Sequence, residues 1–274
     1  MDIRTSAKKY LPVPVADALK AAKYRFDIWT FPKHVVSHRY GPYQLQMNIH
    51  DRIAKEWYDK DWDLPPEIEF LANHGLTCGA RVFDLGAHQC LIAMILGKLV
   101  EPGGQVIAVE ANAHNAAIAR RNIEVNAVTN VEVIHGLVSG LAGKGRVVSS
   151  FNASRAADGE NEVGKALVDA LTVDELARRA GPPAVVYMDI EGFEIEALKG
   201  ATQTIARRCT WFIELHGDTT LSRYHACNRD VLQFFPPVDF DCYLCPEDGL
   251  EFAPLTDAAK LPSDRCFVVF VPTA

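Results

Sequence analysis

Residues 82–110, VFDLGAHQCLIAMILGKLVEPGGQVIAVE, decide the fold class of this chain. They begin with a short apolar run, Val82–Leu85, and end with a second one, Val106–Glu110. Between them, the apolar stretch Leu91–Val100 has the length of a helix and stops before the turn-forming Pro102-Gly103-Gly104. Apolar strands that alternate with helices are typical of a parallel sheet covered by helices on both faces. The stretch therefore predicts an α/β fold.

The same alternation continues toward the C-terminus. A capping box, Thr172 with Glu175, opens one helix, and Gly181-Pro182 ends it. Further helices are predicted over 113–126 and 194–199, and further strands over 131–135, 185–189 and 211–215. The two apolar runs 240–244 and 266–271 predict an antiparallel pair of strands at the sheet edge, because no long helix separates them.

Two regions have a different composition. Residues 137–170 are rich in Gly, Ser, Ala and Asn, and we expect a loop region around one weak strand, Arg146–Ser150. Residues 1–65 hold three of the four tryptophans, and alternating apolar residues on either side of Gly41-Pro42 predict a β-hairpin over 34–49. A helix is predicted from Pro65-Pro66 through Leu71. We expect residues 1–65 to form a cap segment over the ligand edge of a domain formed by residues 66–274.

Composition limits the classes of protein. The 274 residues are 49% hydrophobic and carry a net charge of −7, which excludes a fibrous or disordered chain and argues against a nucleic-acid partner. The longest apolar stretches are far shorter than a membrane span, and the N-terminus does not have the pattern of a secretory signal. Seven scattered cysteines imply no disulfide framework. We therefore expect a cytoplasmic protein with no membrane partner, and the oligomeric state stays open.

The first chemical signal is an acid followed by a glycine turn, Asp84-Leu-Gly86, at the end of the first strand of the α/β pattern. A dinucleotide fold requires two further glycines in this turn, but the next glycine is Gly97. The second signal is Glu110, which ends the next strand, where a carboxylate can accept hydrogen bonds from both hydroxyls of a ribose. Its alternative role is to stabilise the next helix N-terminus. A ribose site without a phosphate loop fits S-adenosylmethionine better than NAD.

The third signal, Tyr187-Met-Asp189-Ile-Glu191-Gly-Phe-Glu194, carries a family resemblance. The blocks at Asp84, Glu110, 171–176, 188–201 and Glu214-Leu-His216 together resemble the FkbM family of S-adenosylmethionine-dependent methyltransferases, over about residues 65–217. The Asp-x-Glu-Gly block is the most specific part. The resemblance implies a seven-stranded, mostly parallel Rossmann-like fold with an antiparallel C-terminal edge. It also implies O-methylation of a hydroxyl on a small-molecule or glycan acceptor.

The resemblance assigns the cofactor residues by their position in these motifs. The methionine end of the cofactor would lie along Asp84, Gly86 and Ala87, the ribose would bind Glu110, and the adenine would be bordered by Asn112, Gly136 and Leu137. This chain has His88 and Cys90 where the family usually has Asn and Gly, and we expect Cys90 to narrow the turn. These departures keep a second possibility open, a methyltransferase-like protein that binds the cofactor without catalysis. An NAD-linked oxidoreductase is a less favoured alternative.

Methyl transfer to a hydroxyl requires a group that removes the proton. Asp189 is the first choice, because it ends the strand expected to face the methyl group, and Glu191 and His216 are the alternates. For Glu191 and Glu194, the other interpretation is stabilisation of a helix N-terminus. The pairs Asp189/Glu191 and Glu214/His216 can also bind Mg²⁺, but a hydrogen-bonded polar cluster is the favoured interpretation.

The remaining candidates are mainly structural. A strand directs the sulfurs of Cys242-x-x-Cys245 to opposite faces, so packed thiols are favoured over a zinc site that would include His225 and Cys227. Four aromatic residues of the N-terminal segment are expected in the core or in a lid, where any that face the site can contact the sulfonium through a cation–π interaction. They are Tyr40, Tyr43, Trp57 and Tyr58.

Overall fold

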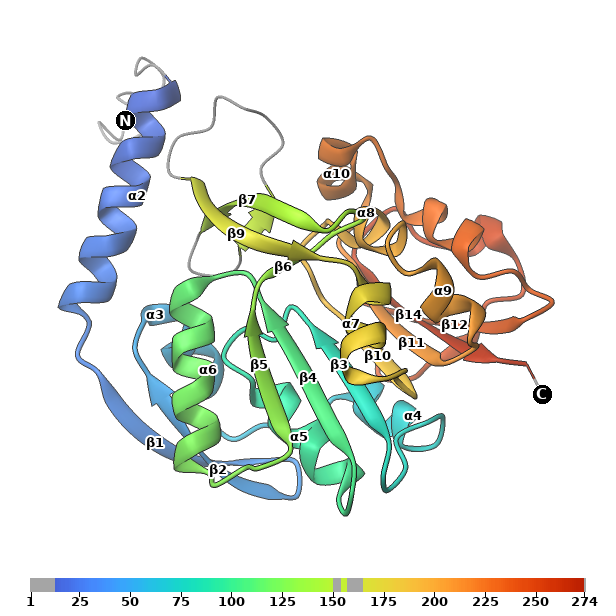
Figure 1. Ribbon diagram of the computed structural model, residues 1–274, viewed down its shortest axis with the longest axis horizontal. Helices are drawn as coiled ribbons and strands as arrows, with labels where there is room; N and C mark the ends of the chain where they lie inside the picture. Colours follow the sequence, from blue (N-terminus) through green and yellow to red (C-terminus); the bar gives the residue numbers. More distant parts are fainter. Residues whose placement is uncertain (1–12, 150–153, 157–164, 274) are drawn as a thin grey trace.

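The predicted strands assemble into one central sheet in the computed structural model of the protein, which describes residues 13–149, 154–156 and 165–273. The sheet has the strand order β13-β12-β14-β11-β10-β3-β4-β5 (Figure 1). Its strands are β3 (Arg81–Leu85), β4 (Gln105–Glu110), β5 (Val131–His135), β10 (Val185–Met188), β11 (Thr210–Leu215), β12 (Phe240–Pro246), β13 (Ala253–Pro254) and β14 (Cys266–Pro272).

The direction of the strands confirms the predicted Rossmann-like fold. β5, β4, β3, β10 and β11 are parallel, and β14 lies antiparallel between β11 and β12. These seven strands are the expected ones, and β13 adds a short eighth strand at the edge. The chain runs from β3 outward to β5 and then returns to β10 on the other side of β3. This reversal places the carboxyl ends of β3 and β10 side by side, which is where open α/β sheets bind ligands.

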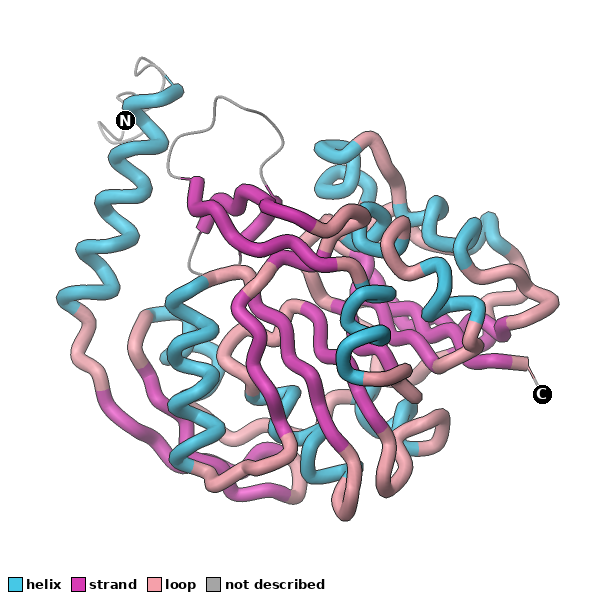
Figure 2. The backbone as a smooth tube through the Cα atoms, in the orientation of Figure 1, coloured by secondary structure: helices cyan, strands magenta, loops and turns pink. Residues whose placement is uncertain are grey.

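Alternation along the strands explains the two helical layers. Val82 and Val106 belong to one hydrophobic core, which they share with α4 (Pro66–Ala72), α5 (Leu91–Val100) and α6 (Ala113–Val125). Phe83 and Ile107, the next residues, belong to a second core on the opposite face. The helices of that face are α7 (Val173–Ala180), α8 (Glu194–Leu198) and α9 (Thr202–Ala206). Figure 2 shows helices and loops around the strands of the sheet.

Short helices follow the last parallel strand. They are α10 (Asp218–Leu221) and the 3₁₀ helices η1 (Ser222–Tyr224), η2 (Asn228–Phe234) and η3 (Ala258–Lys260). In the neighbouring β12, Cys242 packs against the second core and Cys245 is buried, and both are free thiols. This is the packed arrangement that the sequence favoured. No helix in the described part of the chain is long and apolar enough to span a bilayer.

The N-terminal segment contains the predicted hairpin and an unpredicted helix. β1 (His34–Tyr40) pairs antiparallel with β2 (Tyr43–Ile49), as expected. They are preceded by α2 (Val13–Thr30), which Figure 1 shows at one side of the molecule, and followed by α3 (Arg52–Tyr58). The sequence did not indicate α2, because its aromatic Phe26 and Trp29 are exposed and mark no buried face.

Side-chain amides attach the hairpin to the domain. The N–H of Asn48 donates to Asn122 Oδ1 at 2.8 Å, and the N–H of Gln46 donates to Asn126 Oδ1 at 2.8 Å. In return, the Asn126 amide donates to the Gln46 carbonyl at 2.7 Å. Asn122, within α6, and Asn126, at its C-terminal end, therefore form hydrogen bonds with backbone groups along the unpaired edge of β2. The division of the chain at residue 65 stays a prediction.

The prediction that residues 137–170 form mainly loops is wrong. The structure has a second sheet there, in the order β6-β9-β7-β8. Its strands are β6 (Leu137–Val138), β7 (Gly143–Ser149), β8 (Ser154–Ala156) and β9 (Lys165–Leu171), and Ser150 of the predicted strand lies outside the described residues. Val147 and Val168 pack with Leu137 in a small separate core. Tertiary packing therefore overrides the turn-forming composition of the segment.

Candidate active site

A pocket that is open to solvent lies at the carboxyl ends of β3, β4 and β10. The residues that line it are Trp57, Gly86, His88, Val109, Glu110, Ala111, Gly136, Leu137, Val138, Asp189, Ile190, Glu191 and Phe193. They include four of the seven predicted cofactor residues and two of the three predicted catalytic residues. The other predicted residues, Asp84, Ala87, Asn112 and His216, do not line the cavity.

Gly86 allows the turn after β3 to approach the end of β10. Its φ is +94°, and a Cβ placed on it would lie 1.7 Å from the carbonyl oxygen of Asp189. Only glycine fits this position, for both its backbone conformation and its close contact. The turn can therefore pass this close to Asp189 only because residue 86 has no side chain.

Glu110 connects the turn after β3 to the start of α6. Its carboxylate accepts hydrogen bonds from the N–H of His88 at 2.8 Å and from the N–H of Asn112 at 2.6 Å. Burial nevertheless raises the pKa of Glu110 to about 8. A carboxylate has about four acceptor positions, so two further hydrogen bonds, such as those from ribose hydroxyls, can be accepted.

Two predicted cofactor residues, Asp84 near the end of β3 and Ala87 in the turn that follows, are buried. Asp84 is 2% exposed, and burial raises its pKa to about 7. Its Oδ2 has no hydrogen-bond partner among the described residues. Ala87 is buried, and its N–H donates to the Val109 carbonyl at 3.0 Å. The orphaned Asp84 oxygen, the side-chain-free Gly86 and the acceptor capacity of Glu110 fit a cofactor that carries a ribose and an ammonium group.

Asn112 and the 136–137 turn lie toward the expected adenine side. Asn112 is the N-cap of α6 and accepts a hydrogen bond from the N–H of His114 at 2.9 Å. Its amide also donates to the hydroxyl of Tyr24, on α2, at 3.2 Å. Gly136 and Leu137 line the cavity directly. Asn112 is not among the lining residues, so its role at the adenine stays a prediction.

The two departures from the family pattern are accommodated by the backbone. His88 and Cys90 both adopt positive φ angles, 47° and 65°, which cost non-glycine residues some strain. The Nδ1 atom of His88 lies 2.6 Å from the hydroxyl of Tyr58 in a hydrogen bond. Cys90 is fully buried in the first core and does not line the cavity. The Cys90 side chain therefore does not enter the cavity, and its effect on the turn and on cofactor binding stays a prediction.

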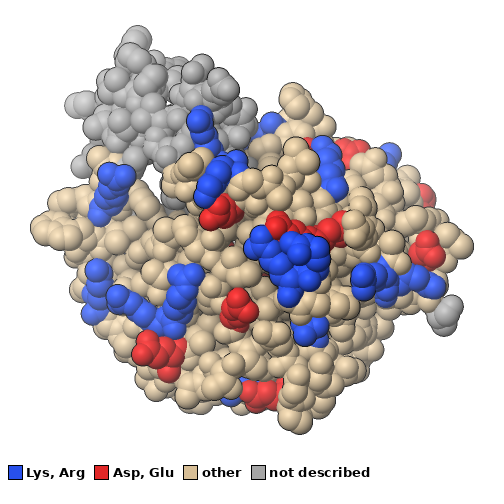
Figure 3. Space-filling view, in the orientation of Figure 1, with Lys and Arg blue, Asp and Glu red and all other residues tan. Residues whose placement is uncertain are grey.

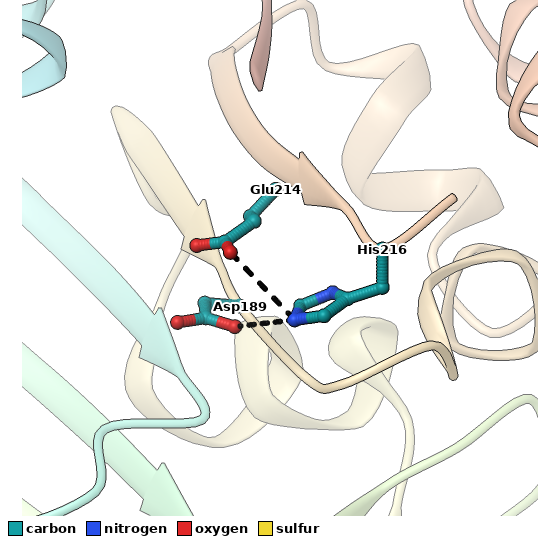
Figure 4. Close-up of side chains that lie close together, drawn as sticks. All are labelled: Asp189, Glu214 and His216. Carbon is teal, nitrogen blue, oxygen red and sulfur yellow. Dashed lines mark ion pairs between the residues drawn. The ribbon is translucent and has the colours of Figure 1, made fainter. Parts of the chain in front are cut away.

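A polar cluster lies beside the cavity, where β10 and β11 end. The Nε2 atom of His216 is 3.5 Å from Asp189, 3.4 Å from Glu191 and 3.6 Å from Glu214. Figure 4 shows Asp189 and Glu214 directed toward the imidazole from neighbouring strands. The other ring nitrogen, Nδ1, lies 2.8 Å from the fully buried carboxylate of Glu194. The structure thus brings together the three predicted catalytic residues.

The electrostatics of the cluster distinguish the roles of its members. Burial lowers the pKa of His216, but the hydrogen bond and the charge of Glu194, with those of the other acids, raise it to about 10. His216 is therefore an imidazolium at neutral pH. Burial and the charge of Glu214 raise the pKa of Asp189 well above its usual range. Burial also raises the pKa of Glu191, against the opposing charge of His216.

Asp189, Glu214 and His216 can each offer one ligand atom to a divalent cation, because these atoms lie within 4.8 Å of one another. However, the guanidinium of Arg265 forms an ion pair with Glu214, and the imidazolium adds a second positive charge. These two cations offset part of the charge of the four carboxylates around His216. The choice between a polar cluster and a metal site stays a prediction. Arg265 had no sequence signal, because it lies 49 residues beyond His216 in a turn-rich segment.

The sequence also underestimated Glu194. It suggested mainly a helix-dipole role, but the Glu194 carboxylate accepts hydrogen bonds from the N–H of Gly192 and from His216, both at 2.8 Å. Glu194 therefore fixes the orientation of the imidazole. The Asp-Ile-Glu-Gly-Phe-Glu spacing indicated that the acids were close to one another but not which of them faced the histidine.

Several solved structures are similar to this chain. One is an S-adenosylmethionine-dependent methyltransferase from Aquifex aeolicus, with 16% identity, a TM-score of 0.44, and coverage of 82% of this chain and 94% of the other. A second is an S-adenosylmethionine-dependent O-methyltransferase from Thermotoga maritima, with 11% identity, a TM-score of 0.44, and coverage of 89% and 79%. A third is an rRNA methylase from Streptococcus thermophilus, with 12% identity, a TM-score of 0.45, and coverage of 76% and 95%.

A search of curated proteins found no match. The family model of the methyltransferase FkbM domain, in contrast, matches residues 78–236. This range covers more than half of the chain and includes the glycine turn, Glu110 and the acids and histidine of the polar cluster. S-adenosylmethionine is therefore the expected cofactor, and the chain belongs to the FkbM methyltransferase family.

Proposed function

We propose that this methyltransferase methylates a hydroxyl group of a small molecule or glycan. The observation that carries the proposal is that Asp189 and Glu191 line the same cavity as Gly86 and Glu110. Two carboxylates with raised pKa values are thus next to the residues assigned to the cofactor. A hydroxyl acceptor needs such a base, because it must lose a proton when it is methylated.

In this proposal, the chain holds the cofactor through residues of three strand ends. Asp84 and the turn at Gly86 and Ala87 bind the methionine end, and Glu110 accepts hydrogen bonds from the ribose. Asn112, Gly136 and Leu137 border the adenine. When bound, S-adenosylmethionine supplies a methyl group already activated by its sulfonium. The protein therefore has to position the acceptor and receive its proton.

Asp189 is the preferred proton acceptor. Asp189 would receive the hydroxyl proton of the acceptor, and bound S-adenosylmethionine would supply the methyl group and be released as S-adenosylhomocysteine. A raised pKa makes the carboxylate of Asp189 a stronger base. His216 already carries a proton at neutral pH, so we assign it to stabilising the ionised carboxylates. Glu191 is the alternate base.

Replacing Asp189 tests this proposal. With an acceptor identified by transfer of a labelled methyl group, Asp189→Asn should lower the turnover rate by about 10²–10⁴ and leave cofactor affinity nearly unchanged. Asp248→Asn, at an exposed acid beyond β12, is the matched control. Normal turnover by Asp189→Asn would refute the base assignment, and Glu191→Gln would then be the next variant to measure.

The alternatives give different results in the same assays. A cofactor-binding protein without catalysis would bind S-adenosylhomocysteine but methylate none of a panel of hydroxyl, amine and thiol acceptors. An NAD-linked oxidoreductase is disfavoured by the family and by the missing glycines of the turn. If the protein methylated only amines, the claim of methyltransferase activity would stand and the claim of a hydroxyl acceptor would be rejected.

A further inference from the structure

Aromatic side chains line the cavity on two different sides. Phe193 packs against the small core of the second sheet, and its ring lies 4.8 Å from that of Tyr224. This core contains Leu137, which places Phe193 on the side assigned to the adenine. Trp57 packs instead against His88, with their ring centroids 5.2 Å apart. Because His88 follows Gly86 and Ala87 and its N–H donates to Glu110, Trp57 lies beside the glycine turn and the carboxylate assigned to the ribose.

Trp57 is held in this place by its neighbours. Its carbonyl accepts a hydrogen bond from the indole N–H of Trp62 at 2.6 Å. The next residue, Tyr58, is 4% exposed, and its hydroxyl forms the hydrogen bond to His88 described above. The end of α3 is therefore tied directly to the turn after β3. The indole is half-buried, and part of its surface faces the cavity.

The chemistry of the cofactor gives this indole a specific use. A sulfonium carries a positive charge but no N–H or O–H group, so it cannot donate an ordinary hydrogen bond. A cation of this kind is recognised by carboxylates and by the negative face of an aromatic ring, and tryptophan is the strongest of the aromatic side chains. The cavity offers both, because Trp57 shares it with Glu110, Asp189 and Glu191.

We propose that Trp57 recognises the sulfonium of S-adenosylmethionine through a cation–π contact. This inference rests on the proposed cofactor site, and it adds a residue of the N-terminal segment to that site. Trp57 would then distinguish the charged methyl donor from the neutral product, S-adenosylhomocysteine. The two ligands differ by one methyl group and one positive charge.

Calorimetric titration of both ligands tests the proposal without any acceptor. Trp57→Leu should lower the affinity for S-adenosylmethionine about three- to thirty-fold more than the affinity for S-adenosylhomocysteine. Trp57→Phe should retain part of this preference. Trp29→Leu, at a tryptophan that is 77% exposed on α2, is the matched control and should change neither affinity.

A second measurement covers the case in which Trp57→Leu does not fold. Tryptophans with increasing fluorination, placed at position 57 alone, keep the shape of the ring but weaken its negative face. The affinity for S-adenosylmethionine should fall with each added fluorine while that for S-adenosylhomocysteine stays constant. Equal losses for the two ligands, or none for either, would overturn the proposal. Failure of the unaltered protein to bind either ligand would instead reject the cofactor site.

Discussion

Gly86 is the residue on which the geometry of the site depends most. Gly86→Ala would place a methyl group against the Asp189 carbonyl, so we expect a loss of about 4 kcal/mol or more in the free energy of unfolding. Gly79→Ala is the matched control, because Gly79 has a similar φ, +82°, but no atom lies within 4 Å of the position that its Cβ would occupy. The backbone strain of an alanine at position 79 should lower the free energy of unfolding by about 1–2 kcal/mol. Equal losses in urea unfolding would show that the close approach is unimportant.

The buried carboxylate of Glu110 makes stability depend on pH. Its pKa is about 8 in the folded protein and 4.5 in an ordinary environment, so the folded state retains a proton that the unfolded state has lost. This contribution to the free energy of unfolding is present below about pH 4.5 and is lost as the pH rises toward 8. Asp84, with a pKa of about 7, acts in the same direction.

Urea unfolding at about pH 5 and about pH 8.5 measures this effect. We expect the free energy of unfolding to fall between these two pH values in the unaltered protein, and to fall less in Glu110→Gln. Glu132→Gln, at an exposed acid on the neighbouring β5, should behave like the unaltered protein. The same pH dependence in all three proteins would contradict the assignment to Glu110.

Some site residues could be predicted from the sequence and others could not. Glu110 and Asp189 end apolar strands, and the carboxyl ends of parallel strands meet at one edge of the sheet, so their position follows from the pattern. Trp57 and Arg265 reach the site through tertiary contacts of segments far away in the sequence. No local periodicity reports such contacts, so the sequence offered Trp57 only as one of four aromatic candidates for a sulfonium contact and gave no signal for Arg265.

Among the elements, the hairpin is attached to α6 in part through Asn122. This side chain is fully buried, accepts from the N–H of Asn48 and donates to the carbonyl of Gln89 at 2.9 Å. Asn122→Ala leaves both backbone groups without these partners, so we expect a loss of about 1–3 kcal/mol. Glu124→Ala, at an exposed position of the same helix, should cost little. Similar stabilities of the two variants in thermal unfolding would contradict this role of Asn122.

Strands with continuous apolar runs could be predicted from the sequence, whereas the strands of the second sheet could not. The strands β3, β4, β10 and β11 are buried on both faces, so their apolar runs identify them. β7 and β9 are different, because glycines interrupt β7 and charged residues interrupt both strands. Val147 and Val168 are their members in a small core, among the side chains that the structure describes. Their pairing with each other stabilises these strands, and a single strand's sequence does not contain that information.

For the whole molecule, the alternation of strands and helices was sufficient to predict the α/β class, and the family resemblance added the seven-stranded Rossmann-like fold. Charge distribution adds little to the fold. Figure 3 shows lysine and arginine side chains interspersed with acidic ones on one face, and several form surface pairs such as Arg179 with Glu175. Exposed pairs of this kind contribute little to stability. The absence of a nucleic-acid partner stays a prediction.

The central claim is that the cavity at the ends of β3, β4 and β10 binds S-adenosylmethionine. The most direct test is urea unfolding of the unaltered protein with and without S-adenosylhomocysteine, with NAD as the comparison. At about 100 times its dissociation constant, S-adenosylhomocysteine should raise the free energy of unfolding by about 2.7 kcal/mol, and NAD should have no comparable effect. Stabilisation by NAD, with none by S-adenosylhomocysteine at any concentration, would contradict the claim.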